Sequence, residues 1–301
     1  MDNKPNLFLI GAPKCGSTSL YQYLRAHPEI YMSPSKEPGF FLSSWKSCRN
    51  NMESYLDLFI GRTKRHLYAG EATTLYLRSR RAIDNLYKFD SNANIIVLVR
   101  NPLELAPAFH SEMLNVQCED VQRFERAWEI REKRLLGEML PDYIHYGRHK
   151  HLLDYGNIAL LGEQLEYLYS VFPVNQVKVL VYDDFKRDAG AATRSVLRWL
   201  GVDENVDIEY ATHRKNVNIR SHFLARFLHQ PPDWIRVIVS RLKKMIRFNG
   251  ELFVWVRTLN QIQQERPQIP QNTKNQMKVF FAEDVALLGS LINRDLSHWL
   301  K

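Results

Sequence analysis

The chain has 301 residues, of which 45% are hydrophobic and 25% are charged, an ordinary composition for a soluble globular protein. No segment is long and apolar enough to cross a membrane, and no leader-like stretch precedes the first expected strand, so we expect neither anchoring nor export. The net charge of +8 favours anionic ligands: nucleotides, sulfated or phosphorylated substrates, nucleic acid or an anionic membrane. The three cysteines, Cys15, Cys48 and Cys118, show neither a disulfide nor a metal-ligand spacing, which favours a reducing compartment, the cytoplasm.

The first expected element is a buried strand, the continuous apolar run Leu7-Phe8-Leu9-Ile10. Apolar residues then recur at helical spacing over residues 20–24. This helix is expected to end at His27-Pro28, because proline disfavours the helical conformation in the residue before it. The chain therefore begins as strand, loop and helix.

Two further apolar and β-branched runs, at residues 95–99 and 177–182, predict buried strands. Helical patterns are expected around residues 124–136, closed by Gly137, along the face of Ile158, Leu161, Leu165 and Leu168, and at residues 191–200, followed by Gly201. This alternation predicts an α/β fold of three layers, in which helices cover both faces of a central, mostly parallel sheet.

Residues 234–257 interleave arginine and lysine with apolar residues and predict an amphipathic basic helix. We interpret it as a surface helix that packs on the domain; the alternative is a platform for a membrane or a substrate. Residues 277–300 carry apolar side chains at helical spacing, which predicts a terminal helix that docks on the domain.

The segment Gly11-Ala12-Pro13-Lys14-Cys15-Gly16-Ser17-Thr18-Ser19 predicts an anion site, because N–H groups and the helix dipole converge where it enters the first helix. Its glycines have the spacing of the nucleoside-triphosphate loop G-x-x-x-x-G-K-[ST], but Ser17 stands at the lysine position. The displaced lysine, Lys14, argues against an ordinary ATPase. The alternative is a plain strand-to-helix turn with Ser17 as N-cap.

Arg100 follows the strand at residues 95–99, at a place where folds that hydrolyse triphosphates carry an acidic residue for Mg²⁺. An arginine there suits bidentate binding of a second phosphate, because ligands of open α/β sheets bind at this edge. We therefore expect no metal. The alternative is that Arg100 only forms a salt bridge at the strand end.

Four segments follow one another in an order and at a spacing that match a known family: Pro13-Lys14-Cys15-Gly16-Ser17-Thr18, Lys36-Glu37-Pro38-Gly39-Phe40-Phe41, Gly70-Glu71 and Arg100-Asn101-Pro102. They resemble sulfotransferases that use 3′-phosphoadenosine 5′-phosphosulfate (PAPS), in particular a bacterial branch similar to carbohydrate and heparan-type enzymes. The resemblance extends to residues 183–185 and 293–299. It implies a P-loop-like fold and one sulfotransferase domain over residues 1–301, with a basic helical insertion at about 231–260 and a C-terminal docking helix at about 272–300.

The resemblance also implies the donor site. The 5′-phosphosulfate is held by Lys14, Cys15, Gly16, Ser17, Thr18 and Ser19, and Lys14 also stabilises the bridging oxygen as the S–O bond breaks. Arg100 binds the 3′-phosphate, a group that ATP lacks.

One family donor to the 3′-phosphate is missing, because the serine eight residues after the arginine is Ala108 here. The backbone of Ala108, or Ser111 or His110 one turn on, is expected to replace it. Arg220 lies in a segment that resembles the family's nucleotide-closing segment and is expected to add a contact; the alternative is an exposed arginine near a helix start.

On the acceptor side, Glu37 matches the family's base, which takes the proton of the acceptor hydroxyl. The alternative is that Glu37 only pairs with Lys36 or nearby arginines. Glu71 is the second candidate for the base, and Lys36 is a candidate for catalysis or acceptor binding. A histidine common in the family is replaced by Gly39 here, and a lysine by Ala72. Both losses suggest an acceptor other than a heparan-type sugar, or a smaller set of polar contacts.

The resemblance implies an enzyme that moves a sulfuryl group from PAPS to a hydroxyl of a saccharide or small metabolite and releases adenosine 3′,5′-bisphosphate, without a metal. Its partners would be PAPS and the acceptor, without nucleic acid, and a peripheral membrane contact through the basic helix stays open. One alternative is a degenerate member that binds nucleotide or polyanion without turnover. A P-loop kinase is the other, but it would need Mg²⁺.

Overall fold

The computed structural model describes residues 4–42, 51–141, 150–210, 218–219, 261–262 and 268–301. The chain divides into two compact units: the first holds residues 1–109, 155–214 and 271–301, and the second holds residues 110–154 and 215–270. The basic helix predicted at about 231–260 lies outside the described residues. Among the residues that are described, no helix is long and apolar enough to cross a membrane.

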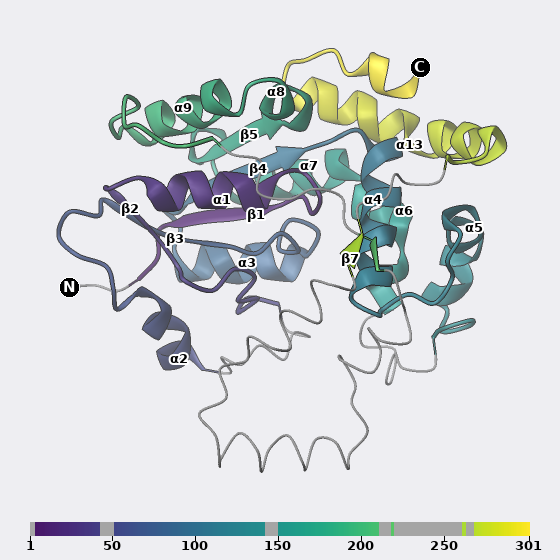
Figure 1. Ribbon diagram of the computed structural model, residues 1–301, viewed down its shortest axis with the longest axis horizontal. Helices are drawn as coiled ribbons and strands as arrows, with labels where there is room; N and C mark the ends of the chain where they lie inside the picture. Colours follow the sequence, from purple (N-terminus) through teal and green to yellow (C-terminus); the bar gives the residue numbers. More distant parts are fainter. Residues whose placement is uncertain (1–3, 43–50, 142–149, 211–217, 220–260, 263–267) are drawn as a thin grey trace, which may run out of the picture. The chain divides into compact units, whose positions relative to one another are not determined.

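The first unit is built on a five-stranded sheet in the order β2-β3-β1-β4-β5, and every neighbouring pair is parallel (Figure 1). Its strands are β1 (Leu7–Gly11), β2 (Ile30–Met32), β3 (Tyr68–Ala72), β4 (Asn94–Val99) and β5 (Val177–Val181). All of β1 is buried, as expected for a strand covered on both faces. The predicted α/β fold with a mostly parallel sheet is confirmed.

The connections explain why both faces are covered. The crossover from β1 to β2 passes through α1 (Ser17–Ala26), and that from β3 to β4 passes through α3 (Arg80–Phe89). These crossovers run in opposite directions along the strand order, so right-handed connections place their helices on opposite faces. α1 packs with α9 (Ala189–Leu200), and α3 packs with α7 (Leu161–Val171).

The helices predicted within the described residues are present, but the C-terminal helix, expected to run to about residue 300, ends at Leu291. Asn293 has φ +51°, which ends the α-helix, and a short 3-10 helix, Ser297–Leu300, follows. α1 gives way to extended backbone at His27, before Pro28, and α9 ends at Gly201, whose φ is +71°. The apolar face of residues 158–168 is divided between α6 (Tyr155–Ala159) and α7. The remaining described α-helices are α2 (Met52–Leu56), α4 (Pro102–Asn115), α5 (Phe124–Leu135), α8 (Tyr182–Arg187) and α13 (Gln271–Leu291).

The second unit contains α5 and the antiparallel pair β6 (Asn218–Ile219) and β7 (Gln261–Ile262). A buried ion pair joins α5 to the segment before it: the guanidinium of Arg134 donates to both carboxylate oxygens of Glu119. Both side chains are almost completely buried, so removing Arg134 would leave the Glu119 carboxylate inside this unit without its guanidinium partner.

In the first unit the C-terminal helix α13 packs against α7, and a buried carboxylate joins the two. Asp284 of α13 accepts hydrogen bonds from the backbone N–H groups of Gly162 and Glu163, both at 2.9 Å. A carboxylate at this position satisfies N–H groups that the helix leaves without partners and complements the positive end of its dipole. A Cβ at residue 162 would lie 2.4 Å from the carbonyl oxygen of Asp284, so a side chain here would push the two helices apart.

Gly162→Ala is therefore expected to lower the free energy of unfolding by about 1–3 kcal/mol, the usual cost of overpacking a well-packed interior. Urea denaturation followed by circular dichroism measures the change. Gly190→Ala in α9 is the matched control, because a Cβ there would meet the end of the Arg194 side chain at 3.1 Å, and such an end can move aside. Equal stability of the two variants would contradict the close approach at Gly162.

Candidate functional site

The loop between β1 and α1 has the backbone of an anion site. Gly16 is the N-cap of α1 with φ +88°, and a Cβ there would lie 3.0 Å from ring carbons of Phe185, so conformation and space both require glycine. α1 begins at Ser17 without a side-chain cap and without an acidic residue in its first turn. The first N–H groups of α1 therefore suit a negatively charged ligand.

Arg100 follows β4, and its guanidinium is held on three sides. Its Nη1 donates to the carbonyl oxygen of Lys14 at 2.8 Å, while Nε and Nη2 donate to the Glu104 carboxylate at 3.1 and 2.6 Å. Its central carbon lies 4.4 Å from the ring centroid of Tyr182. The arginine therefore contacts the anion loop directly, and residues of α4 and α8 fix its orientation.

Lys36 contacts the start of α1 at Ser17, and Glu37 contacts Thr74, just after β3. The carboxylate of Glu37 accepts hydrogen bonds from the backbone N–H and the hydroxyl of Thr74, both at 3.0 Å. The ammonium of Lys36 donates to Glu37 at 2.8 Å and to the hydroxyl of Ser17 at 3.4 Å. Since the Glu37 side chain is 35% exposed, its carboxylate is fixed in place and still open to solvent.

Glu71, the second candidate for the base, is 0% exposed. Its carboxylate accepts hydrogen bonds from the hydroxyls of Tyr55 and Tyr76, both at 2.9 Å, and of Thr73 at 2.6 Å. Burial raises the pKa of Glu71 to about 7, and the three hydrogen bonds oppose that rise. With no exposed surface, Glu71 has no direct route to an acceptor hydroxyl.

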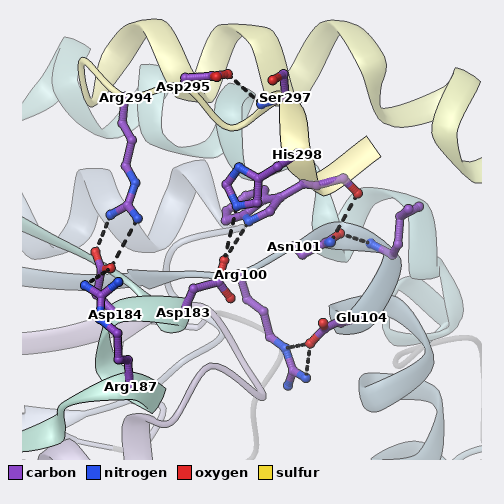
Figure 2. A network of polar contacts seen from close by, with 12 residues as sticks. Arg100, Asn101, Glu104, Asp183, Asp184, Arg187, Arg294, Asp295, Ser297 and His298 are labelled. Carbon is purple, nitrogen blue, oxygen red and sulfur yellow. Dashed lines mark hydrogen bonds and ion pairs between the residues drawn. The ribbon is translucent and has the colours of Figure 1, made fainter. Parts of the chain in front are cut away.

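The C-terminal segment is tied to the ends of β4 and β5 (Figure 2). Arg294 forms an ion pair with Asp184, and the indole N–H of Trp299 donates to Asp183 at 2.8 Å. The side chain of Asn101 donates to the carbonyl oxygen of Trp299 at 3.2 Å. Three segments that carry the sequence resemblance, far apart along the chain, are thus joined in one unit.

The other predicted donor-site residues differ in their placement. Cys15 is buried, and burial raises the pKa of its thiol to about 12, so its side chain acts in packing rather than as a thiolate. Thr18 and Ser19 lie in the first turn of α1. Ala108 is buried within α4, and Ser111 lies on the part of α4 that belongs to the second unit. Arg220 is outside the described residues.

Several contacts of the site were not predicted: Glu104 and Tyr182 around Arg100, Thr74 on Glu37, and the hydroxyls around Glu71. Glu104 had a sequence signal, because it follows Arg100 by four residues at the start of a helix, the spacing of a side-chain pair. Tyr182, Thr74 and Tyr55 contact residues distant in sequence. Thr73 and Tyr76 lie two and five residues after Glu71, but no local pattern indicates that their hydroxyls meet a buried carboxylate.

Comparison with known proteins places this geometry in a family. Residues 4–223 match the family model described as the sulfotransferase domain. Membrane-associated sulfotransferase kil1 of Dictyostelium discoideum is 34% identical over 102 residues, which are 33% of this chain and 21% of that protein. Human carbohydrate sulfotransferase 15 is 42% identical over 64 residues, 18% of this chain and 11% of that protein. Mouse heparan sulfate glucosamine 3-O-sulfotransferase 3B1 is 29% identical over 121 residues, 40% of this chain and 30% of that protein.

The chain thus spans less than a third of the length of each of these relatives. The crystal structure of a sulfotransferase from Alicyclobacillus acidocaldarius has the same fold, with a TM-score of 0.71 and 24% identity over 99% of both chains. Because the family model covers most of the chain, including the loop, Glu37 and Arg100, the chain belongs to the sulfotransferase domain family, whose members use PAPS.

Proposed function

We propose that this chain transfers a sulfuryl group from PAPS to a hydroxyl of a saccharide or small metabolite and releases adenosine 3′,5′-bisphosphate. The observation that carries the proposal is the contact between Arg100 and the Lys14 carbonyl oxygen at 2.8 Å. It joins a strand-end arginine to an anion loop, and a nucleotide with phosphates at both its 5′ and 3′ positions can contact the two together.

The residues present fit such a donor. Gly16 lets the 5′-phosphosulfate approach the uncapped start of α1, and Lys14 adds a positive charge to the loop. Arg100 has a planar guanidinium that suits the 3′-phosphate. Glu104 occupies one edge of that guanidinium and the Lys14 carbonyl oxygen accepts from Nη1, so the 3′-phosphate would use the remaining N–H groups of Nη1 and Nη2.

Bound PAPS supplies the sulfuryl group, and residues of this chain bind the donor, stabilise its charge and remove the proton of the acceptor. The N–H groups of α1 and the hydroxyl of Ser17 bind the phosphosulfate oxygens. Lys14 balances the charge on the bridging oxygen as its bond to sulfur breaks. Glu37 takes the proton of the acceptor hydroxyl as the new O–S bond forms. Lys36 places positive charge between Glu37 and Ser17, close to both partners of the transfer.

A second candidate function is nucleotide or polyanion binding without turnover. The replacements at Ala108, Ala72 and Gly39 motivate it, since each removes a polar side chain that the family pattern carries. Labelled PAPS with a panel of hydroxyl acceptors separates this candidate from an enzyme. Transfer to any acceptor would exclude it.

Thermal unfolding with three nucleotides tests the donor assignment. Adenosine 3′,5′-bisphosphate is expected to raise Tm far more than AMP or ATP with Mg²⁺ at equal concentrations, because only the first ligand carries a 3′-phosphate. A ligand at about 100 times its Kd stabilises the folded state by about 2.7 kcal/mol, so a difference in affinity appears directly in Tm. Equal shifts with all three nucleotides would overturn the proposal.

A further inference from the structure

Glu71 is a buried acid that the proposed mechanism does not use. It stands near the carboxyl end of β3, 0% exposed, and three hydroxyl groups donate to it. Burying a carboxylate costs free energy unless hydrogen bonds compensate, and an apolar side chain of similar size would avoid that cost. Glu71 therefore needs an explanation other than stability alone.

Two of the three hydroxyls continue the network into the segment that carries Glu37. The Thr73 hydroxyl accepts a hydrogen bond from the backbone N–H of Gly39 at 3.2 Å and donates to Glu71 at 2.6 Å. The Tyr76 hydroxyl accepts from the backbone N–H of Phe41 at 3.2 Å and donates to Glu71 at 2.9 Å. Two backbone amides are thus linked to one carboxylate through two hydroxyl groups.

All hydrogen bonds in these two relays point the same way, from N–H to hydroxyl to carboxylate. Each hydroxyl donates its single proton to Glu71 and accepts from a backbone amide through a lone pair. The relays therefore end on the two carboxyl oxygens of Glu71, whereas a glutamine would replace one of these acceptors with an NH₂ donor. Glutamate at position 71 is specified by the direction of the network.

The segment that the relays hold has a backbone that needs support. Glu37 has φ +57° and Gly39 has φ +65°, and the first is uncommon for a residue with a side chain. The backbone N–H of Glu37 donates to the carbonyl oxygen of Ala72 at 2.8 Å. The backbone N–H groups of Glu37, Gly39 and Phe41 thus all donate to residues 72–76.

We propose that Glu71 is a positioning residue, which through Thr73 and Tyr76 holds residues 37–41 so that the carboxylate of Glu37 faces the donor loop. The importance of this positioning for the reaction rests on the proposed function, because Glu37 acts as a base only in sulfuryl transfer. The positioning itself is a property of the folded chain and can be measured without PAPS or an acceptor.

The network offers its own control. The hydroxyl of Tyr55 also donates to Glu71, but no relay leads from it to the Glu37 segment among the described contacts. Tyr68 lies in the same strand as Glu71, and its hydroxyl donates instead to the carbonyl oxygen of Leu200 at 2.7 Å. Removing these two hydroxyls costs one buried and one partly buried hydrogen bond but leaves both relays in place.

Hydrogen–deuterium exchange of the full chain tests the positioning. In Tyr76→Phe and Thr73→Val, the amides of Glu37 and Thr74 are expected to exchange about 5-fold to 10-fold faster, the effect of about one lost hydrogen bond. These amides make no bond to the deleted hydroxyls, since Glu37 donates to Ala72 and Thr74 donates to Glu37. In Tyr55→Phe and Tyr68→Phe their exchange should equal that of the wild type.

Faster exchange confined to Phe41 or Gly39 would overturn the proposal, because it would mean that the relays do not reach Glu37. Thr73→Ser restores the hydroxyl and should restore slow exchange; failure to do so would also count against the relay.

Kinetics connect the network to the reaction. With labelled PAPS and an acceptor that the wild type uses, Tyr76→Phe should lower kcat by about 10-fold to 100-fold, as small misplacements of catalytic groups do. The Kd for adenosine 3′,5′-bisphosphate should stay unchanged. If exchange responds as expected but the wild type transfers to no acceptor, the positioning stands and the proposed function fails. If kcat is unchanged although the amides of Glu37 and Thr74 exchange faster, the network does not contribute to the transfer.

Discussion

Glu37→Gln is expected to lower the rate of sulfuryl transfer by about 10²-fold to 10⁴-fold, the usual contribution of a general base. The glutamine amide cannot take the proton of the acceptor hydroxyl. Its oxygen can still accept a hydrogen bond from Thr74, whose N–H and hydroxyl both donate to the Glu37 carboxylate at 3.0 Å in the wild type. The side chain changes little in size, so the segment around it should keep its conformation. The measurement is single-turnover transfer from labelled PAPS.

Nucleotide binding by Glu37→Gln distinguishes a loss of catalysis from a loss of structure. Glu37→Gln should bind adenosine 3′,5′-bisphosphate as the wild type does, because Glu37 contacts the donor loop only through Lys36. Glu204→Gln is a matched control, since its carboxylate also pairs with a cation, Arg198, but lies away from the loop. If Glu37→Gln turns over as fast as the wild type, another residue is the base. If the variant no longer binds the nucleotide, Glu37 has a structural role instead.

The sequence predicted those parts of the fold in which local pattern and tertiary environment agree. β1 and β4 are apolar runs because both faces of these strands are covered, and β5 is recognised by its β-branched valines, although Lys178 and Val179 are only partly buried. β3 was not predicted, because Tyr68-Ala69-Gly70-Glu71-Ala72 has little β-branched or aromatic character. A Cβ at Gly70 would lie 2.8 Å from the carbonyl oxygen of Leu7, so packing against β1 selects glycine over a strand-forming residue.

The candidate site divides in a similar way. The loop and Arg100 were predictable, because a glycine spacing and a strand end are local features. The burial of Glu71 was not, since its three donors come from Tyr55, Thr73 and Tyr76, and the fold alone brings Tyr55 to it. A glutamate in a sequence gives no sign of whether it faces solvent or three buried hydroxyls. The sequence therefore could not show that Glu71 is buried while the Glu37 side chain stays 35% exposed.

Arg100→Ala is expected to weaken binding of adenosine 3′,5′-bisphosphate by about 10²-fold, because hydrogen bonds between charged groups contribute about 1.5–3 kcal/mol each. Binding of AMP should weaken much less, since AMP lacks the 3′-phosphate. Some loss for AMP is still expected, because the contact between Arg100 and the Lys14 carbonyl oxygen supports the loop that we propose to bind the 5′-phosphate. Titration calorimetry at one fixed ionic strength measures both affinities.

Arg100→Lys separates the charge of this residue from its shape. Lysine keeps the positive charge but cannot contact Glu104, the Lys14 carbonyl oxygen and a phosphate at once through a planar fork, as the guanidinium can. We therefore expect Arg100→Lys to recover only part of the lost preference for the 3′-phosphate. Arg198→Ala, which removes an exposed arginine paired with Glu204, should leave both affinities unchanged. An equal loss of both nucleotides in Arg100→Ala would mean that Arg100 serves the loop alone, and that the 3′-phosphate is bound by other residues.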